Sequence, residues 1–266
     1  MLQADIEAFE RDGAVLIPRV VDGAWVNKLA AAIDRDIANP GPFFHGYEIE
    51  SGGRFHGNIR VWENDPDFAA YCLDSPLPGL AAELMGAKSV RLLYDQLFVK
   101  DSATDAPTRW HNDQPYWPVR GRQVLSFWLA LDEVTLDSGG LEFIAGSHKW
   151  DRWFQPEPFA PGGTSYTRNP NYEEIPDYEQ ERDQHAILSW DMQPGDVIAF
   201  HAMTVHYAGP NTRADRQRRG YTVRYIGDDA TYLWEEGMAS GFVHDGQVEG
   251  QPFTGPHYPQ VWPASV

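Results

Sequence analysis

Residues 108–150 read TRWHNDQPYWPVRGRQVLSFWLALDEVTLDSGGLEFIAGSHKW, and this stretch decides the fold. Its short apolar runs at 124–131 and 141–145 are separated by glycine, proline and aspartate, which is typical of antiparallel strands joined by turns. Near its start, His111-Asn112-Asp113 sets an imidazole and a carboxylate two positions apart. On an extended backbone these side chains project to the same side. The stretch therefore predicts a β-rich domain that carries a pair of metal ligands.

A third ligand is predicted in the segment GDVIAFHAMTVHYAGPN at 195–211, which holds two histidines. His201 and His206 are five positions apart, so on a continuous strand only one of them faces inward. His206 directly precedes a turn signal and is expected at the mouth of a barrel, whereas His201 is expected to pack in the sheet. His148, within Gly-Ser-His-Lys, is expected to fix a turn. Two histidines, one carboxylate and open positions describe the facial site of non-haem Fe(II) oxygenases.

The composition limits the partners that the protein can have. The 266 residues carry a net charge of −18, which disfavours nucleic acid and anionic membrane surfaces and leaves a small molecule as the expected partner. Cys72 is the single cysteine, so no internal disulfide is expected, and it is predicted to be buried. The first residues lack a signal pattern and no apolar run is long enough to span a bilayer. We expect a cytoplasmic protein.

The chain read in order predicts helices first and strands later. Helices are expected at 3–12, from the N-cap Asp22 to about 39, at 68–73 and at 77–85 before Gly86. Further strands are expected at 14–18, 88–100, 197–200 and 221–226. Residues 1–266 are therefore predicted to form one α+β, mainly β domain. Its architecture is a double-stranded β-helix, a jelly-roll or cupin-like barrel, backed by N-terminal helices.

Two segments have no clear periodicity. Residues 43–64 are predicted to be a loop that covers the entrance of a pocket, although a surface-packed loop fits equally well. Residues 150–182 are rich in Pro, Gly, Asn, Tyr and Glu, and an irregular segment of this length is usually a functional lid or disordered. We expect a lid-like insertion there, over the mouth of the barrel.

Four arginines lie within residues 213–219, shortly after His206. One interpretation is a solvated basic loop on the surface of an acidic protein. The other is that one guanidinium binds the distal carboxylate of 2-oxoglutarate through two hydrogen bonds, since arginine suits planar anions. The residues alone leave both interpretations open.

The order of the motifs resembles the phytanoyl-CoA dioxygenase (PhyH) family of Fe(II)/2-oxoglutarate oxygenases. HxD is followed by GG-L-x-F-x-x-GSHK, then by GDVIxFH-x4-H-x4-N, then by arginine, and the likeness runs from DIEAFERDGAVLIPRVV to HYPQVW. The resemblance implies that His111, Asp113 and His206 bind Fe(II), with 2-oxoglutarate and O2 as cosubstrates. It implies Arg218, or else Arg219, as the clamp for 2-oxoglutarate.

The resemblance also implies further contacts with 2-oxoglutarate. Gln96 and Trp128 match positions that touch it in relatives, and Lys100 is a weaker candidate. Ala208 stands where some relatives have a serine, which removes one expected hydrogen bond. For the substrate, the sequence suggests aromatic or cationic pocket walls at Tyr116, Trp117, Phe55, Arg60 and Trp62.

The reaction that the resemblance implies is hydroxylation of an unactivated C–H bond of a small-molecule metabolite, with release of succinate and CO2. The carboxylate of Asp113 favours hydroxylation over halogenation, while desaturation, epoxidation and ring closure stay open. Two other interpretations of the same three ligands are a cupin-like metal-dependent isomerase or hydrolase, and a non-catalytic small-molecule binding module on the same barrel.

Overall fold

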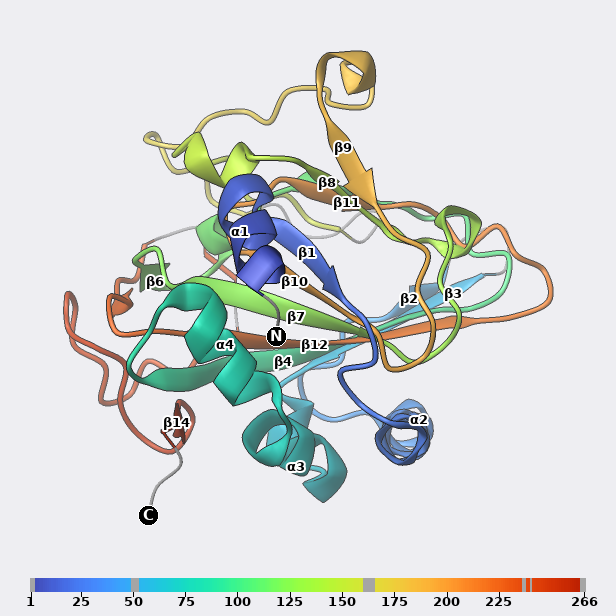
Figure 1. Cartoon of the computed structure of the whole chain (residues 1–266), viewed down its shortest axis with the longest axis horizontal. Coiled ribbons are helices and arrows are strands. Elements are labelled where there is room, and N and C mark those ends of the chain that lie inside the picture. Colours follow the sequence, from blue (N-terminus) through green and yellow to red (C-terminus); the bar gives the residue numbers. More distant parts are fainter. Residues whose placement is uncertain (1–2, 49–52, 160–165, 236–237, 240, 264–266) are drawn as a thin grey trace.

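The chain forms a double-stranded β-helix with helices packed on one outer face, as the computed structural model shows (Figure 1). Residues 3–48, 53–159, 166–235, 238–239 and 241–263 are described. The large antiparallel sheet has the strand order β1-β10-β7-β12-β4-β3-β2, and β14 pairs with β4. Its strands are β1 (Ala14–Ile17), β2 (Tyr47–Glu48), β3 (Arg54–Ile59), β4 (Val90–Lys100), β7 (Val124–Ala130), β10 (Val197–His201), β12 (Arg218–Ile226) and β14 (Gln260–Trp262).

The second sheet lies against the other face of the large one and has the order β5-β11-β8-β9. It consists of β5 (Thr108–His111), β8 (Leu141–Ile144), β9 (Ile187–Ser189) and β11 (His206–Ala208), and a separate pair joins β6 (Val119–Arg120) to β13 (Thr231–Tyr232). Short 3-10 turns occur at Val61–Glu63, Gln114–Tyr116, Leu136–Ser138, Ser147–Lys149 and Arg182–Gln184. The predicted jelly-roll architecture is confirmed.

The described residues form four α-helices: α1 (Gln3–Asp12), α2 (Gly23–Ala38), α3 (Pro66–Asp74) and α4 (Leu77–Met85). The predicted N-cap of α2 is confirmed, since the Asp22 carboxylate accepts hydrogen bonds from the backbone N–H groups of Ala24 and Trp25. Gly86 ends α4 in the left-handed conformation that favours glycine, with φ at 60°. Among the described residues, no helix is long and apolar enough to cross a bilayer.

Strand β12 separates the helical core from an internal cavity, because its side chains alternate between the two faces of the large sheet. Tyr221, Val223 and Tyr225 belong to the buried cluster that also contains helical residues such as Leu29, Phe68 and the fully buried Cys72. The alternate residues 218, 222 and 224 line the cavity between the two sheets. The fold thereby presents one face of β12 to whatever the cavity binds.

The prediction of a loop for residues 43–64 is wrong in part, because β3 lies within it. This strand pairs with β4, and in the sequence only Phe55 and Ile59 mark its apolar side, with Gly57 between them. Two of its polar residues are nevertheless buried: His56 and Asn58 both bond the carboxylate of Asp36 on α2, at 2.7 and 2.8 Å. A short strand with polar residues on one buried side and a glycine on the other has only a weak hydrophobic signature.

Candidate metal centre

His111, Asp113 and His206 converge on one wall of the cavity. Strands β5 and β11 pair there so that His206 lies opposite His111. The Nε2 atoms of His111 and His206 lie 3.4 and 3.9 Å from Oδ1 of Asp113. All three residues are buried, and one ligand atom from each lies within 4.8 Å of the others. The structure therefore brings the three predicted ligands together.

The backbone conformation at Asp113, the last residue of the HxD motif, differs from the predicted one. Asp113 is not on an extended strand: its backbone is helical, with φ −76° and ψ −41°, and it begins the turn Gln114–Tyr116. The backbone N–H groups of Asp113 and Gln114 both donate to the carbonyl of Ala202, at 2.9 and 3.1 Å. This shared acceptor fixes the turn and aims the carboxylate at the two imidazoles.

The tautomer of each histidine is set by a backbone carbonyl. Nδ1 of His111 donates to the carbonyl of Arg109 at 2.7 Å, and Nδ1 of His206 donates to that of Thr204 at 3.0 Å. Because a carbonyl can only accept, a proton lies on Nδ1 of each ring, and Nε2 is the atom that faces the cluster. Burial also lowers the pKa of His206 to about 3, so the imidazole is neutral.

Asp113 supplies the negative charge of the cluster. Burial favours its neutral acid, but the neighbouring imidazoles and the guanidinium of Arg224 favour the carboxylate, and the pKa of Asp113 is lowered overall. Nε2 of each imidazole and a carboxylate oxygen thus face one another. This donor set, open toward the cavity, fits a first-row divalent metal such as Fe(II).

The cavity beside the cluster has a volume of about 600 Å³. That size is within the range of roughly 300–1,000 Å³ that is usual for small-molecule sites. Aromatic rings are the commonest side chains in its walls, and polar and charged groups lie among them. Its lining includes Phe43, Phe44, His45, Tyr47, Phe55, Tyr94, Gln96, Phe98, Tyr116, Trp117, Trp128, Phe159, Tyr166, Thr222 and Phe242.

Of the two candidate clamp arginines, Arg218 faces the cavity and Arg219 does not. The Arg218 side chain is buried, its Nη1 donates to the carbonyl of Phe98 at 3.0 Å, and its Nε has no partner among the described residues. Burial lowers the pKa of Arg218 to about 10. Arg219 points the other way and forms an ion pair with Asp132 at 2.7 Å. Of these two arginines, Arg218 is therefore the one placed to receive a ligand in the cavity.

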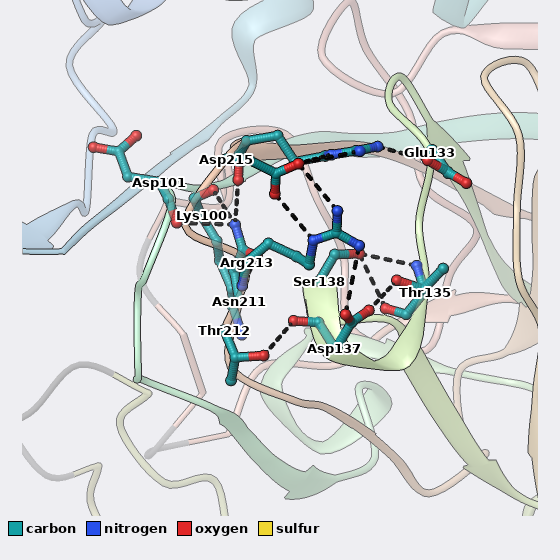
Figure 2. Close-up of polar contacts among 11 residues, drawn as sticks. Lys100, Asp101, Glu133, Thr135, Asp137, Ser138, Asn211, Thr212, Arg213 and Asp215 are labelled. Carbon is teal, nitrogen blue, oxygen red and sulfur yellow. Dashed lines mark hydrogen bonds and ion pairs between the residues drawn. The ribbon is translucent and has the colours of Figure 1, made fainter.

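The other two arginines of the basic loop are engaged at the surface. Figure 2 shows Arg213 between Asp215 and Asp137, with nitrogen–oxygen distances of 3.0 and 3.6 Å. Arg216 pairs with Glu133 at 2.5 Å. Arg213 and Arg216 thus fit the solvated-loop interpretation, whereas Arg218 faces the cavity. The sequence alone could not assign the arginines to these two groups.

Of the remaining residues predicted to contact 2-oxoglutarate, two line the cavity and one does not. Gln96 and Trp128 line the cavity. Lys100 is buried and points to the loop after β11, where its Nζ donates to the carbonyl of Gly209 at 2.5 Å. Its ammonium is therefore occupied by the backbone and does not line the cavity.

The predicted substrate residues are only partly placed as expected. Tyr116, Trp117 and Phe55 line the cavity. Arg60 instead forms an ion pair with Glu63 at 2.7 Å, and its Nη1 donates to the carbonyl of Gly241. Trp62 packs against the helical core. Arg60 and Trp62 are therefore corrections, because neither is among the residues that line the cavity.

The insertion reaches the metal ligands through two aromatic rings. The Tyr116 hydroxyl donates to the carbonyl of Glu157 at 3.0 Å and accepts from its N–H at 2.8 Å. Phe159 stacks on Tyr116 and lies edge-on to His111, with ring centres 5.3 and 4.6 Å apart. Residues 157–159 thus cover one side of the site, while residues 160–165 of the predicted insertion lie outside the described part of the chain.

Sequence reasoning missed Arg224 and Thr222. Both lie on β12, on the same face as Arg218, and both line the cavity. Counting in steps of two from Arg218 leads to positions 220, 222 and 224, so the alternation of a strand was the available signal.

Comparison with known proteins agrees with this architecture. The sequence pattern of the family described as "Phytanoyl-CoA dioxygenase (PhyH)" matches residues 9–220. A probable phytanoyl-CoA dioxygenase of Caenorhabditis elegans is 24% identical over 209 residues, which cover 76% of this chain and 64% of that protein. The chain therefore spans slightly less than two thirds of this relative's length.

Two solved structures share the fold along nearly the whole chain. The non-heme alpha ketoglutarate dependent carbocyclase SnoK from nogalamycin biosynthesis has a TM-score of 0.76 and 23% identity, covering 98% of this chain and 96% of its own. The epimerase SnoN, in complex with Fe3+, alpha ketoglutarate and nogalamycin RO, has a TM-score of 0.77 and 22% identity, covering 97% and 98%. By the match over residues 9–220, the chain belongs to the phytanoyl-CoA dioxygenase (PhyH) family.

Proposed function

We propose that the protein is an Fe(II)- and 2-oxoglutarate-dependent oxygenase that hydroxylates an unactivated C–H bond of a small-molecule metabolite. The observation that carries this proposal is one cavity with two features. One wall holds two imidazoles and a carboxylate, and another holds the buried guanidinium of Arg218, whose Nε has no partner among the described residues. A metal and a carboxylate-bearing cosubstrate account for both.

Bound iron and 2-oxoglutarate would supply the oxidising power: one atom of O2 enters succinate as CO2 leaves, and the other enters the product alcohol. His111, Asp113 and His206 would hold the metal on one side and leave its cavity side open. Arg218 would bind the distal carboxylate of 2-oxoglutarate. The aromatic walls would exclude water and orient the substrate.

Ring closure or epimerisation is a second candidate outcome. The carbocyclase SnoK and the epimerase SnoN share the fold, so this scaffold supports reactions other than hydroxylation. Asp113 supports hydroxylation over halogenation, because its carboxylate occupies the position that a halide would need. Chromatography with mass spectrometry separates the outcomes: hydroxylation adds one oxygen to the substrate, ring closure removes two hydrogens, and epimerisation changes the retention time at constant mass.

The experiment that tests the proposal is succinate release. Purified protein supplied with Fe(II), ascorbate and 2-oxoglutarate should release succinate slowly even without a primary substrate. Asp113→Ala should abolish this release, and Asp101→Ala, which removes a surface carboxylate paired with Arg54, should not. A wild-type protein that binds iron and releases no succinate would instead favour the cupin-like isomerase or hydrolase, or the binding module.

A further inference from the structure

Arg224 is a buried cation in the cavity with unsatisfied donors. Its side chain is 4% exposed, and its Nε and Nη1 have no hydrogen-bond partner among the described residues. Oδ2 of Asp113 lies 3.9 Å from Nε, which is too far for a hydrogen bond. An arginine taken out of water in this way costs free energy unless a ligand completes its hydrogen bonds.

Aromatic rings hold the Arg224 guanidinium in place without using its donors. Its central carbon lies 4.4 Å from the ring centre of Tyr94 and 5.2 Å from that of Trp117. The ring of Phe98 is 5.9 Å away. Contacts with ring faces restrict the plane of the guanidinium and leave its N–H groups for an acceptor. The pairing of β12 with β4 is also irregular beside Arg224, as is common where a strand aims a side chain at a site.

Arg224 and Arg218 serve different anions. They are six residues apart on the same strand, so their Cα atoms are separated by roughly 20 Å at about 3.3 Å per residue. One carboxylate cannot bind both. Arg224 lies beside Asp113 at the metal end of the cavity, whereas Arg218 contacts the Phe98 carbonyl and stands over Trp128.

The charges of the loaded site leave Arg224 uncompensated. The two positive charges of the metal and that of Arg218 balance the carboxylate of Asp113 and the two carboxylates of 2-oxoglutarate. Lys100 adds little to this sum, because burial, with the nearby charge of Arg218, lowers its pKa well below the usual value. One positive charge therefore remains in the cavity, and an additional anion would neutralise it.

We propose that Arg224 binds a carboxylate of the primary substrate, which is then an amphipathic acid with an apolar or aromatic body. The body would lie against the rings of Phe43, Phe55 and Phe242, which line the same cavity. Thr222 offers a second donor, since its buried hydroxyl also has no partner among the described residues. This inference rests on the proposed function, because it assigns 2-oxoglutarate to Arg218.

The test compares carboxylates with their neutral amides. Protein loaded with Mn(II) and saturating 2-oxoglutarate is titrated by calorimetry with phenylacetate, 3-phenylpropionate and 2-naphthoate, and with the three matching primary amides. At least one acid should bind about tenfold or more tightly than its amide, as expected for a charge-assisted hydrogen bond in a buried site. Equal binding of acid and amide, or no binding of any acid, overturns the proposal.

Substitutions of Arg224 then test whether this residue causes the preference for acids over amides. Arg224→Gln should reduce the advantage of the acid to within about twofold while leaving the affinity for the amide unchanged. Arg122→Gln, at an exposed arginine outside the cavity, should keep the advantage. Arg224→Lys retains the charge without the planar fork and should keep part of the advantage, which provides a test if Arg224→Gln does not fold. An undiminished preference for the acid in either Arg224 variant overturns the proposal.

A 2-oxoglutarate titration of each variant separates this proposal from the proposed function. If wild-type protein does not bind 2-oxoglutarate, the oxygenase assignment fails. If it binds 2-oxoglutarate normally and shows no preference for acids, only the role of Arg224 fails. If Arg224→Gln weakens 2-oxoglutarate or Mn(II) binding and leaves acid binding intact, Arg224 belongs to the cosubstrate or to Asp113, and the proposal is overturned.

Discussion

His206 lies directly opposite His111 across the ladder between β5 and β11, and both rings turn Nε2 toward Asp113. Residues almost one hundred positions apart in the chain thus form one ligand set through the register of a single strand pair. Each imidazole is held by a backbone carbonyl, so the ligand set is prearranged before any metal binds.

We expect His206→Ala to lower the affinity for Mn(II) or Fe(II) by at least about 100-fold, because a first ligand matters more than the partners that orient it. Calorimetric titration with Mn(II) measures this change. His257→Ala is the matched control, since His257 contacts Glu63 and is not among the residues that line the cavity. Unchanged metal binding by His206→Ala would remove His206 from the ligand set.

Arg218→Ala should raise the dissociation constant for 2-oxoglutarate roughly 10- to 100-fold, as expected for the loss of charge-assisted hydrogen bonds. Arg219→Ala should leave that constant nearly unchanged, because Arg219 is paired with Asp132 on the opposite face of β12. Both are measured by titrating 2-oxoglutarate into the Mn(II)-loaded protein. The reverse ranking of the two variants would show that Arg218 is a structural arginine.

Gly220→Ala should distort the cavity, because a Cβ at Gly220 would lie 2.2 Å from Cζ2 of Trp128. The indole must move, which costs about 1–3 kcal/mol of unfolding free energy and displaces a wall of the predicted 2-oxoglutarate site. Urea denaturation and 2-oxoglutarate titration measure the two effects. Gly23→Ala at the start of α2, where a Cβ meets nothing within 4 Å, should show neither.

Asp95→Asn should change how stability depends on pH. Burial raises the pKa of Asp95 to about 7 from 3.8, although Tyr221 and the N–H of Trp62 donate to its Oδ2. A raised pKa means that the folded state retains a proton that the unfolded state loses. The stabilisation is therefore fully present below about pH 4 and is lost as the pH rises through about 7, by up to about 4 kcal/mol.

Urea unfolding at about pH 5 and about pH 8 measures this loss. Wild-type protein should lose more stability between the two values than Asp95→Asn does. Asp101→Asn, at a surface carboxylate, should follow the wild type. Parallel curves for wild type and Asp95→Asn would show that Asp95 is ionised across this range.

The ligand residues could be predicted from the sequence because each lies beside a local signal. His111 and Asp113 share a motif, and His206 precedes a turn. The reason given for the motif was incomplete, since Asp113 is aimed by a helical turn bonded to Ala202 and not by strand alternation. The residue types and their order along the chain identify the ligands. The geometry of the site depends on tertiary hydrogen bonds to the carbonyl of Ala202.

The walls of the cavity were harder to predict, because they depend on the register of β12 and β4. Arg224 could be placed beside Asp113 only after the start of β12 was known to be Arg218. Arg60 and Trp62 do not line the cavity, because Arg60 pairs with Glu63 and Trp62 packs against the helical core. Aromatic and cationic composition alone does not say which face of a loop a side chain occupies.

Arg218 and Arg219 are consecutive residues that serve opposite faces of one strand. A slip of a single position would exchange the cation in the cavity for one that faces Asp132. The close fit of Gly220 against Trp128 resists such a slip, because any larger residue brought to that place collides with the indole. The register of β12 is therefore set within the strand, and insertions or deletions in the preceding surface loop can occur without moving Arg218 out of the cavity.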